Sequence, residues 1–248
     1  MTNFSLLPGT ANTRIPGGGL IPEGLSRPHV LLRSDHLANI GDEDIRRLKN
    51  WNIHTVIDLR RDDEIKSRPT PASLERLARI RRIPIDNLEF LLHRRKDPDF
   101  QLWELYFHML ETQSQSIAEA VDAVACHLAA GSVLFHCSAG KDRTGILSAL
   151  LLLSAHVEEK EVVRDYELTK GTLPTKSEEE ISTLPPHTDE FFFRMLLSCE
   201  GVHMRKTLRH LRKMGGARTY LKKAGVADWQ MDSISDVLTK LPKNTSVR

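Results

Sequence analysis

The stretch that decides the fold covers residues 133–145 and reads VLFHCSAGKDRTG. It begins with apolar residues that suit a buried strand and then turns abruptly to Cys137, Gly140, Arg143 and Thr144. A packed core has no use for that order of residues. The stretch therefore predicts a strand at 132–136, a reactive loop, and a helix from about 144 to 156.

Patterns on both sides of this stretch place it in a larger α/β domain. Residues 54–59 and 78–85 read as two further strands, and a short helix is predicted from Asp42, with that aspartate as its cap. Helical stripes of apolar residues occupy 102–110 and 117–128, and the chain is helical again over 188–241. Alternating helices and strands predict a central parallel sheet flanked by helices, with a helical C-terminal part.

The 248 residues carry a net charge of only +2 and suit a single domain spanning 1–248. Residues 1–40 are rich in glycine and proline and predict an irregular arm or short hairpin, while the polar segment 171–190 is a candidate flap. The weak charge does not favour a nucleic-acid partner. No signal peptide is recognisable and the longest apolar run is too short for a bilayer, so we expect a cytoplasmic protein without stable membrane insertion.

The cysteines are spaced neither for a disulfide framework nor for a zinc site. Cys126 and Cys199 fall on apolar helix faces and are expected to be core thiols, and we expect no metal and no cofactor. The sequence does not indicate the oligomeric state.

The loop carries the chemistry of an anion site with a nucleophile. Cys137 would stand at the carboxyl end of a parallel strand, where open α/β sheets bind ligands. The backbone amides of Ser138, Ala139 and Gly140 precede a helix N-terminus and can cradle a phosphate, and Arg143 can return across the loop to grip two oxygens of the same anion. The same positive groups favour the thiolate over the thiol. This arrangement supports attack of the thiolate on phosphorus, a cysteinyl-phosphate, and hydrolysis of that intermediate.

Two neighbours of the loop have supporting roles in this hypothesis. His136 would orient the loop and tune the thiol, and the Thr144 hydroxyl can hydrogen-bond the sulfur when it departs. A nucleotide-binding P-loop is excluded by spacing, because Phe135 stands where the first glycine belongs and Asp142 replaces the required serine or threonine.

HCSAGKDRTG resembles the phosphate-binding loop of the protein tyrosine phosphatase superfamily, and its GKDRTG ending is most similar to the bacterial and fungal tyrosine phosphatase family. LLRSDHL, TVIDLRRDDE, HMLETQSQSI, RDYELTKG and YLKKAGV stand in the order typical of that family, so the resemblance covers nearly the whole chain. It implies a phosphorylated protein or phosphoinositide substrate. One departure is visible, because NTRIPGG carries Ile15 where the family usually has aspartate.

The leaving group needs a general acid, and several aspartates are candidates. The resembling family has aspartate at Asp142, which makes this residue the first choice, although it could instead cap the helix. Asp58, at the end of a strand, could supply the proton or orient loop residues or Arg143. Asp97 and Asp99 are further candidates, although loop positions suit them better.

Lys141 and Arg60 are candidate substrate-binding cations. In related phosphatases that hydrolyse phosphoinositides, a lysine in this loop contacts a further ring phosphate, whereas simple solvation is the alternative for Lys141. Two other functions stay open: a rhodanese-like sulfurtransferase, which the loop's ending disfavours, and a phosphate-binding module without turnover.

Overall fold

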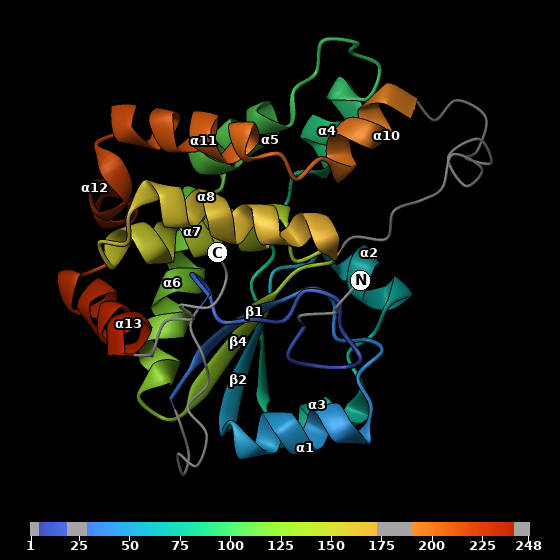
Figure 1. Ribbon diagram of the computed structural model, residues 1–248, viewed down its shortest axis with the longest axis vertical. Coiled ribbons are helices and arrows are strands. Elements are labelled where there is room, and N and C mark those ends of the chain that lie inside the picture. The colour runs from blue at the N-terminus through green and yellow to red at the C-terminus, as the bar shows by residue number, and fades with distance from the viewer. Residues whose placement is uncertain (1–4, 19–28, 173–189, 241–248) are drawn as a thin grey trace.

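The computed structural model describes residues 5–18, 29–172 and 190–240, and within them it has one four-stranded sheet. All strand pairs in the sheet are parallel, in the order β1-β4-β2-β3 (Figure 1). The strands are β1 (Leu31–Ser34), β2 (Ile53–Asp58), β3 (Arg79–Arg82) and β4 (Ser132–His136). The predicted α/β class, with a central parallel sheet flanked by helices, is confirmed.

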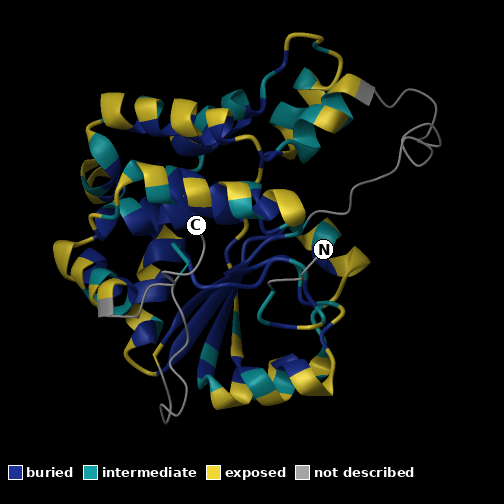
Figure 2. Ribbon diagram, viewed as in Figure 1, coloured by how far each residue is buried: buried dark blue, intermediate teal, exposed yellow. Residues whose placement is uncertain are grey.

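The strands β1, β2 and β4 are buried on both faces, because their largely continuous apolar runs supply side chains to each side of the sheet, whereas the edge strand β3 is mostly exposed. Val133 and Phe135 of β4 join a large hydrophobic cluster on one face, whereas Leu134 joins a smaller cluster on the other. The sheet therefore separates two cores, and Figure 2 shows β1 and β4 and most of β2 as the buried centre of the molecule.

Helices cover each face of the sheet (Figure 1). The larger cluster is covered by α6 (Ser114–Leu128) and α7 (Asp142–Ser154), and the smaller one by α1 (Asp42–Asn50) and α3 (Ala72–Leu77). Further helices pack outside α6 and α7: α5 (Leu102–Thr112), α8 (Glu159–Glu167), α11 (Gly201–Lys213), α12 (Gly216–Lys223) and α13 (Asp228–Lys240). The short elements are α2 (Asp62–Ser67), α4 (Leu88–Arg94), the 3₁₀ turn η1 (Leu168–Gly171) and α10 (Glu190–Leu197).

The described parts of the N-terminal arm, residues 5–18 and 29–40, are more ordered than their composition suggests. Residues 5–18 turn back so that Arg14 forms an antiparallel bridge with Arg33 of β1. Residues 31–34 were expected to belong to an irregular arm or short hairpin, but they instead form the edge strand β1 beside β4. This segment therefore adds a strand that the sequence analysis did not predict.

Two local predictions were wrong. The first helix is capped by Gly41, whose N–H donates to the Asp44 carboxylate at 2.9 Å, so Asp44 rather than Asp42 satisfies the free amide. Cys126 is exposed at the surface of α6 and its thiol donates to Asp122. Cys199 is buried as expected, but it lies in the connection between α10 and α11 rather than on a helix. An apolar helical stripe fixes which face is buried only to within about one residue position.

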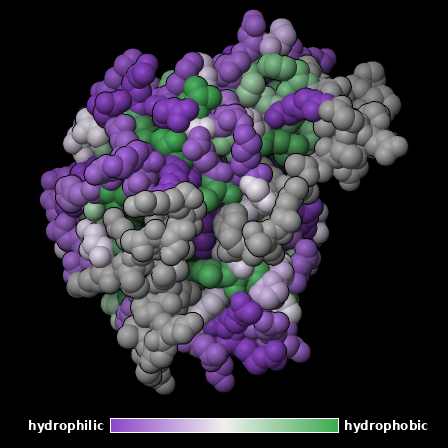
Figure 3. Space-filling view, viewed as in Figure 1, coloured by the Kyte–Doolittle hydropathy of each residue, from purple (hydrophilic) through white to green (hydrophobic). Residues whose placement is uncertain are grey.

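Figure 3 shows mixed polar and apolar side chains on the visible face, with hydrophobic ones gathered over α4 and α10. Leu88, Leu92 and Phe191 are exposed there. No helix among the described residues is both long and apolar enough to span a bilayer. Most of the predicted flap, residues 173–189, lies outside the described residues.

Candidate active site

Cys137 lies directly after β4, which runs between β1 and β2 in the middle of the sheet. The chain continues from β2 to the edge strand β3, but from β4 it enters α7, which packs over β4 and β1. The loop therefore lies at the carboxyl ends of the strands, where α/β folds bind ligands. The helix α7 begins at Asp142, slightly before the predicted start. Cys137 is 2% exposed.

The carbonyl groups of the loop point outward to protein donors. Backbone groups donate to two of them: His36 N to Ser138 O, and Gly145 N to Lys141 O. Side chains bind the other three: His136 Nδ1 binds Cys137 O, Asn12 Nδ2 donates to Ala139 O and Gly140 O, and Arg33 Nη2 donates to Gly140 O. The backbone N–H groups of residues 138–144, in contrast, donate to no group of the described chain. With every carbonyl from 137 to 141 turned away, the amides form a ring of unsatisfied donors suited to an oxyanion.

The sharp turn of this ring requires a glycine. Gly140 has a φ of 66°, in the left-handed region, and a Cβ there would lie 2.7 Å from Ser34 O and 2.6 Å from Asp35 N. Only the absence of a side chain lets the loop pack against the end of β1.

Arg143 is folded back toward the loop by Glu64 of α2. Its Nη1 and Nη2 donate to Glu64 Oε2 and Oε1 at 2.6 and 2.7 Å, and the Ser138 hydroxyl also donates to Glu64 Oε1, at 2.5 Å. Burial opposes the charge on Glu64, but the hydrogen bonds and charge of Arg143 outweigh it and lower the Glu64 pKa to about 2. Burial likewise opposes the charge on Arg143, yet its partners Glu64 and Cys137 raise its pKa. The guanidinium is thus permanently charged and fixed in orientation.

A buried ion network supports the other side of the loop. Asp165 of α8 pairs with Arg14 Nε at 3.0 Å and with Arg33 Nη1. Burial opposes ionisation of Asp165, but the two guanidinium groups lower its pKa. Since Arg33 also donates to Gly140 O at 2.7 Å, Asp165 positions the donor that turns this carbonyl outward.

Asp58 and Arg60 bind one another beneath the loop. Arg60 Nε and Nη2 donate to the Asp58 carboxylate at 2.9 and 2.7 Å, and His136 Nε2 lies 3.7 Å from Asp58 Oδ2. Burial lowers the pKa of His136. Asp58 is 0% and Arg60 2% exposed, and each is engaged by the other, whereas the carboxylate that holds Arg143 belongs to Glu64.

Asp142 and Lys141 face the helical side of the site. Asp142 Oδ1 accepts from the Tyr106 hydroxyl at 2.7 Å, and Tyr106 is hydrogen-bonded in turn to the Tyr166 hydroxyl at 2.6 Å. The Lys141 amine, 1% exposed as a residue, donates to Leu196 O and to Ser198 O. Lys141 therefore anchors the segment after α10 rather than reaching toward solvent.

The Thr144 side chain is buried in the first turn of α7, and its hydroxyl has no hydrogen-bond partner among the described residues. A buried hydroxyl without a partner is unusual, and here it belongs to the residue after Arg143. It is therefore free to serve the sulfur or the substrate.

The sequence analysis missed four supporting residues: Asn12, Arg33, Glu64 and Asp165. Each lies within a motif that carried the family resemblance, and a charged residue inside the apolar strand 31–34 was a signal for Arg33. Ile15, the departure from the family pattern, is buried in the smaller hydrophobic cluster, while its neighbours Asn12 and Arg14 make the polar contacts.

Comparison with known proteins gives a consistent family match. A model described as "Tyrosine phosphatase family" matches residues 6–240. A tyrosine-protein phosphatase from Nostoc commune is 28% identical over 225 residues, which cover 83% of this chain and 72% of that protein. Two crystal structures of P. aeruginosa TpbA, one in complex with pTyr, cover 74% and 76% of this chain and 98% of their own, at 14% identity with TM-scores of 0.37 and 0.35. The family match includes the loop and every residue of its supporting network.

Proposed function

The chain belongs to the tyrosine phosphatase family and is a protein-tyrosine-phosphatase, a phosphoric monoester hydrolase, and we propose that it works through a cysteinyl-phosphate on Cys137. The observation that carries this mechanism is the polarity of the loop. All its carbonyls are turned outward to protein donors, its amides are left for an anion, and Glu64 fixes the orientation of the Arg143 guanidinium. Such donors stabilise the charge of a transferring phosphoryl group without reorganising.

The proposed reaction has two steps. In the first, the Cys137 thiolate forms an S–P bond while the bond from phosphorus to the leaving oxygen breaks, and that oxygen takes a proton from the general acid. In the second, water attacks phosphorus, gives its proton to the same group, and the S–P bond breaks to release inorganic phosphate. The Thr144 hydroxyl would hydrogen-bond the departing thiolate.

Asp142 is the general acid in this proposal. It belongs to the loop, and its side chain is 24% exposed, so a substrate oxygen can approach it. Asp58 is fully buried and bound to Arg60, and Asp97 pairs with Arg94 at 3.0 Å outside the loop. Among these candidates, only Asp142 combines a place beside the phosphate ring with access from solvent.

Phosphotyrosine in proteins is the proposed substrate. The phosphoinositide alternative depended on a lysine that reaches a second ring phosphate, and the Lys141 amine instead binds two backbone carbonyls. Arg60 is likewise engaged by Asp58 and by Arg68 O. Neither cation supports a preference for polyphosphorylated lipids in this arrangement.

Phosphate release from 4-nitrophenyl phosphate and from a phosphotyrosine peptide tests the mechanism. Cys137→Ser should abolish both, and wild type should retain activity in EDTA. Full activity in Cys137→Ser would exclude the cysteinyl-phosphate. Asp142→Asn should slow an alkyl or phenyl ester about 100-fold or more and 4-nitrophenyl phosphate far less, because a good leaving group needs little protonation. Equal losses on both esters would remove Asp142 from the acid role.

The same preparations separate the alternative functions. Transfer of sulfur from thiosulfate to cyanide would indicate a rhodanese-like enzyme, and tight phosphopeptide binding without phosphate release would indicate a binding module.

A further inference from the structure

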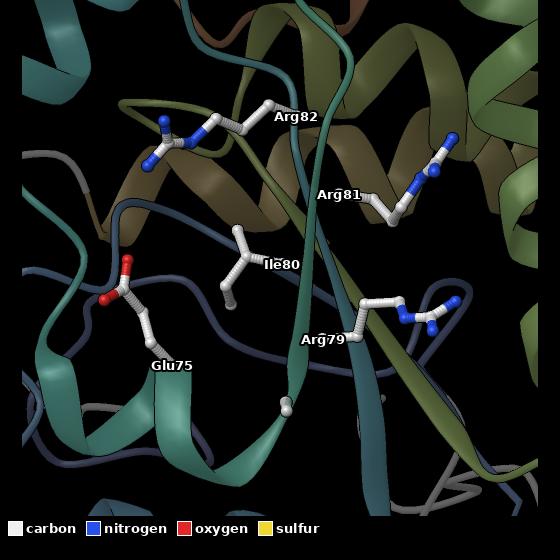
Figure 4. A pocket seen from close by; sticks show the side chains of 6 residues that line it. Glu75, Arg79, Ile80, Arg81 and Arg82 are labelled. Carbon is white, nitrogen blue, oxygen red and sulfur yellow. The ribbon is translucent and has the colours of Figure 1, made fainter.

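The free edge of the sheet is formed by β3 and is strongly basic. β3 reads RIRR, and Arg79, Arg81 and Arg82 are all exposed. With Glu75 and Ala78 of the adjoining α3 segment, these residues and Ile80 line an open groove of about 590 Å³. Figure 4 looks onto this edge: Arg79 and Arg81 point to one side of the strand, and Ile80 and Arg82 to the other, toward Glu75.

The backbone of β3 has unused hydrogen-bonding groups on its outer side. Ile83 N donates to Asp58 O of β2 at 2.9 Å. Because the backbone groups of a strand alternate in direction, the N–H and C=O groups of Arg79 and Arg81 also point toward β2. The N–H and C=O groups of Ile80 and Arg82 then point away from the sheet, where the described chain places no further strand. This edge can therefore pair with one additional extended segment.

The charges of the groove select the kind of segment. No carboxylate of the described residues forms an ion pair with Arg79 or Arg82, and Arg81 has only a 3.7 Å contact with Glu119 of α6. Glu75 is the one acidic residue that lines the groove. A second copy of this strand would place arginine against arginine, which disfavours self-pairing. An acidic segment would instead be attracted from both faces of the strand.

The carboxyl end of β3 lies in register with the strand ends that carry the candidate active site. Asp58 pairs in register with Arg82 on one side and with His136, the residue before Cys137, on the other. At a spacing of about 4.8 Å per strand, the Arg82 backbone lies roughly 10 Å from that of His136. A segment paired with β3 thus leads toward the same edge of the sheet as the phosphate ring.

We propose that an extended acidic segment of the protein substrate docks on β3 as a fifth strand, beside the phosphorylated residue. Main-chain hydrogen bonds to Ile80 and Arg82 would fix its position, and its carboxylates would meet the arginines. That the segment belongs to the substrate rests on the proposed phosphatase function, whereas the docking itself does not.

Three peptides test this inference. Each has a central phosphotyrosine: one is flanked by Glu and Thr, one by Gln and Thr, and one repeats the acidic sequence with N-methyl groups at alternate flanking residues. Wild type should show a kcat/KM about tenfold higher on the acidic peptide than on the neutral one. The N-methylated peptide should lose most of this advantage, because it cannot pair with the strand.

The variant Arg79→Glu/Arg82→Glu should abolish the preference and leave hydrolysis of 4-nitrophenyl phosphate unchanged. Arg209→Glu/Lys213→Glu on α11 is the matched control, since it makes the same change in net charge at exposed positions on the helical side. A preference that survives in the first variant, or falls equally in the control, would overturn the proposal. So would an N-methylated peptide as good as its parent.

Docking can also be measured independently of catalysis, as binding of labelled, unphosphorylated acidic and neutral peptides followed by fluorescence anisotropy. If wild type hydrolyses no phosphate ester, selective binding of the acidic peptide that disappears in Arg79→Glu/Arg82→Glu still supports the docking edge. Equal binding of the two peptides would overturn it. The failure of the phosphatase function is thereby distinguished from the failure of this inference.

Discussion

Glu64 holds Arg143 by two parallel hydrogen bonds, from Nη1 to Oε2 at 2.6 Å and from Nη2 to Oε1 at 2.7 Å. The carboxylate reaches Arg143 from α2, which follows β2, whereas Arg143 belongs to α7, which follows β4. Adjacent parallel strands bring these two helix starts together at one edge of the sheet. The pair therefore fixes the guanidinium before any phosphate arrives.

Removing this carboxylate should disable the arginine without deleting it. In Glu64→Gln, Arg143 loses its ionic partner and the Ser138 hydroxyl loses a charged acceptor. We expect kcat on 4-nitrophenyl phosphate to fall about 10- to 100-fold. Asp63→Asn is the control, because Asp63 is an exposed neighbour whose ion pair is with Arg61. Equal rates for Glu64→Gln and the control would contradict the positioning role.

The same pair predicts a pH dependence of stability. The folded-state pKa of Glu64, about 2, lies below its ordinary value of 4.5. Its contribution to stability is therefore complete above pH 4.5 and is lost as the pH falls toward 2. Urea unfolding of wild type and Glu64→Gln should show a free-energy difference that is constant near neutrality and shrinks through this range. A constant difference down to pH 3 would contradict the assignment.

Asp165 should be the most costly carboxylate to neutralise in the network behind the loop. In Asp165→Asn, the charges of Arg14 and Arg33 stay buried without a counter-ion, so we expect a loss of about 3 to 5 kcal/mol in the free energy of unfolding. Glu43→Gln removes the exposed partner of Arg47 and should cost less than about 1 kcal/mol. Similar unfolding midpoints for the two variants would contradict this ranking.

Gly140→Ala should damage the phosphate ring itself. The new methyl group would collide with Ser34 and Asp35 at a residue already in the left-handed region. We expect lower stability and loss of phosphate binding, measured by thermal unfolding with and without vanadate. Gly171→Ala is the control, because a Cβ there meets no atom of the described residues within 4 Å. A fully active Gly140→Ala enzyme would show that the loop can relax.

Lys141→Ala should act on all substrates alike. Its amine holds Leu196 O in the last turn of α10 and Ser198 O just after it, so its removal should loosen this end of α10 and cost about 1 to 3 kcal/mol in the free energy of unfolding. We expect proportional changes in phosphate release from phosphotyrosine, phosphothreonine and phosphoinositide substrates. A selective loss on phosphoinositides would instead assign Lys141 to a second phosphate.

The sequence by itself determined the local chemistry of this protein. Apolar residues running into Cys137, followed by Gly140 and Arg143, allow few structures other than a strand, an anion loop and a helix, because backbone amides and chain direction are set locally. The α/β class followed from the alternation of helices and strands, and both are properties of nearby residues. The family resemblance rested on the same short segments.

Only the tertiary structure decided which side chains surround the loop. Glu64, Asn12, Arg33 and Asp165 come from distant parts of the chain, and their contacts depend on strand order, with β4 between β1 and β2. Strand order also made β3 a basic edge of the sheet, and the packing of the end of α10 beside the loop turned Lys141 inward, since burial and pairing arise from elements that meet only after folding. The nucleophile could be predicted from residue types alone, but the residues that position it could be identified only from the arrangement of the whole sheet.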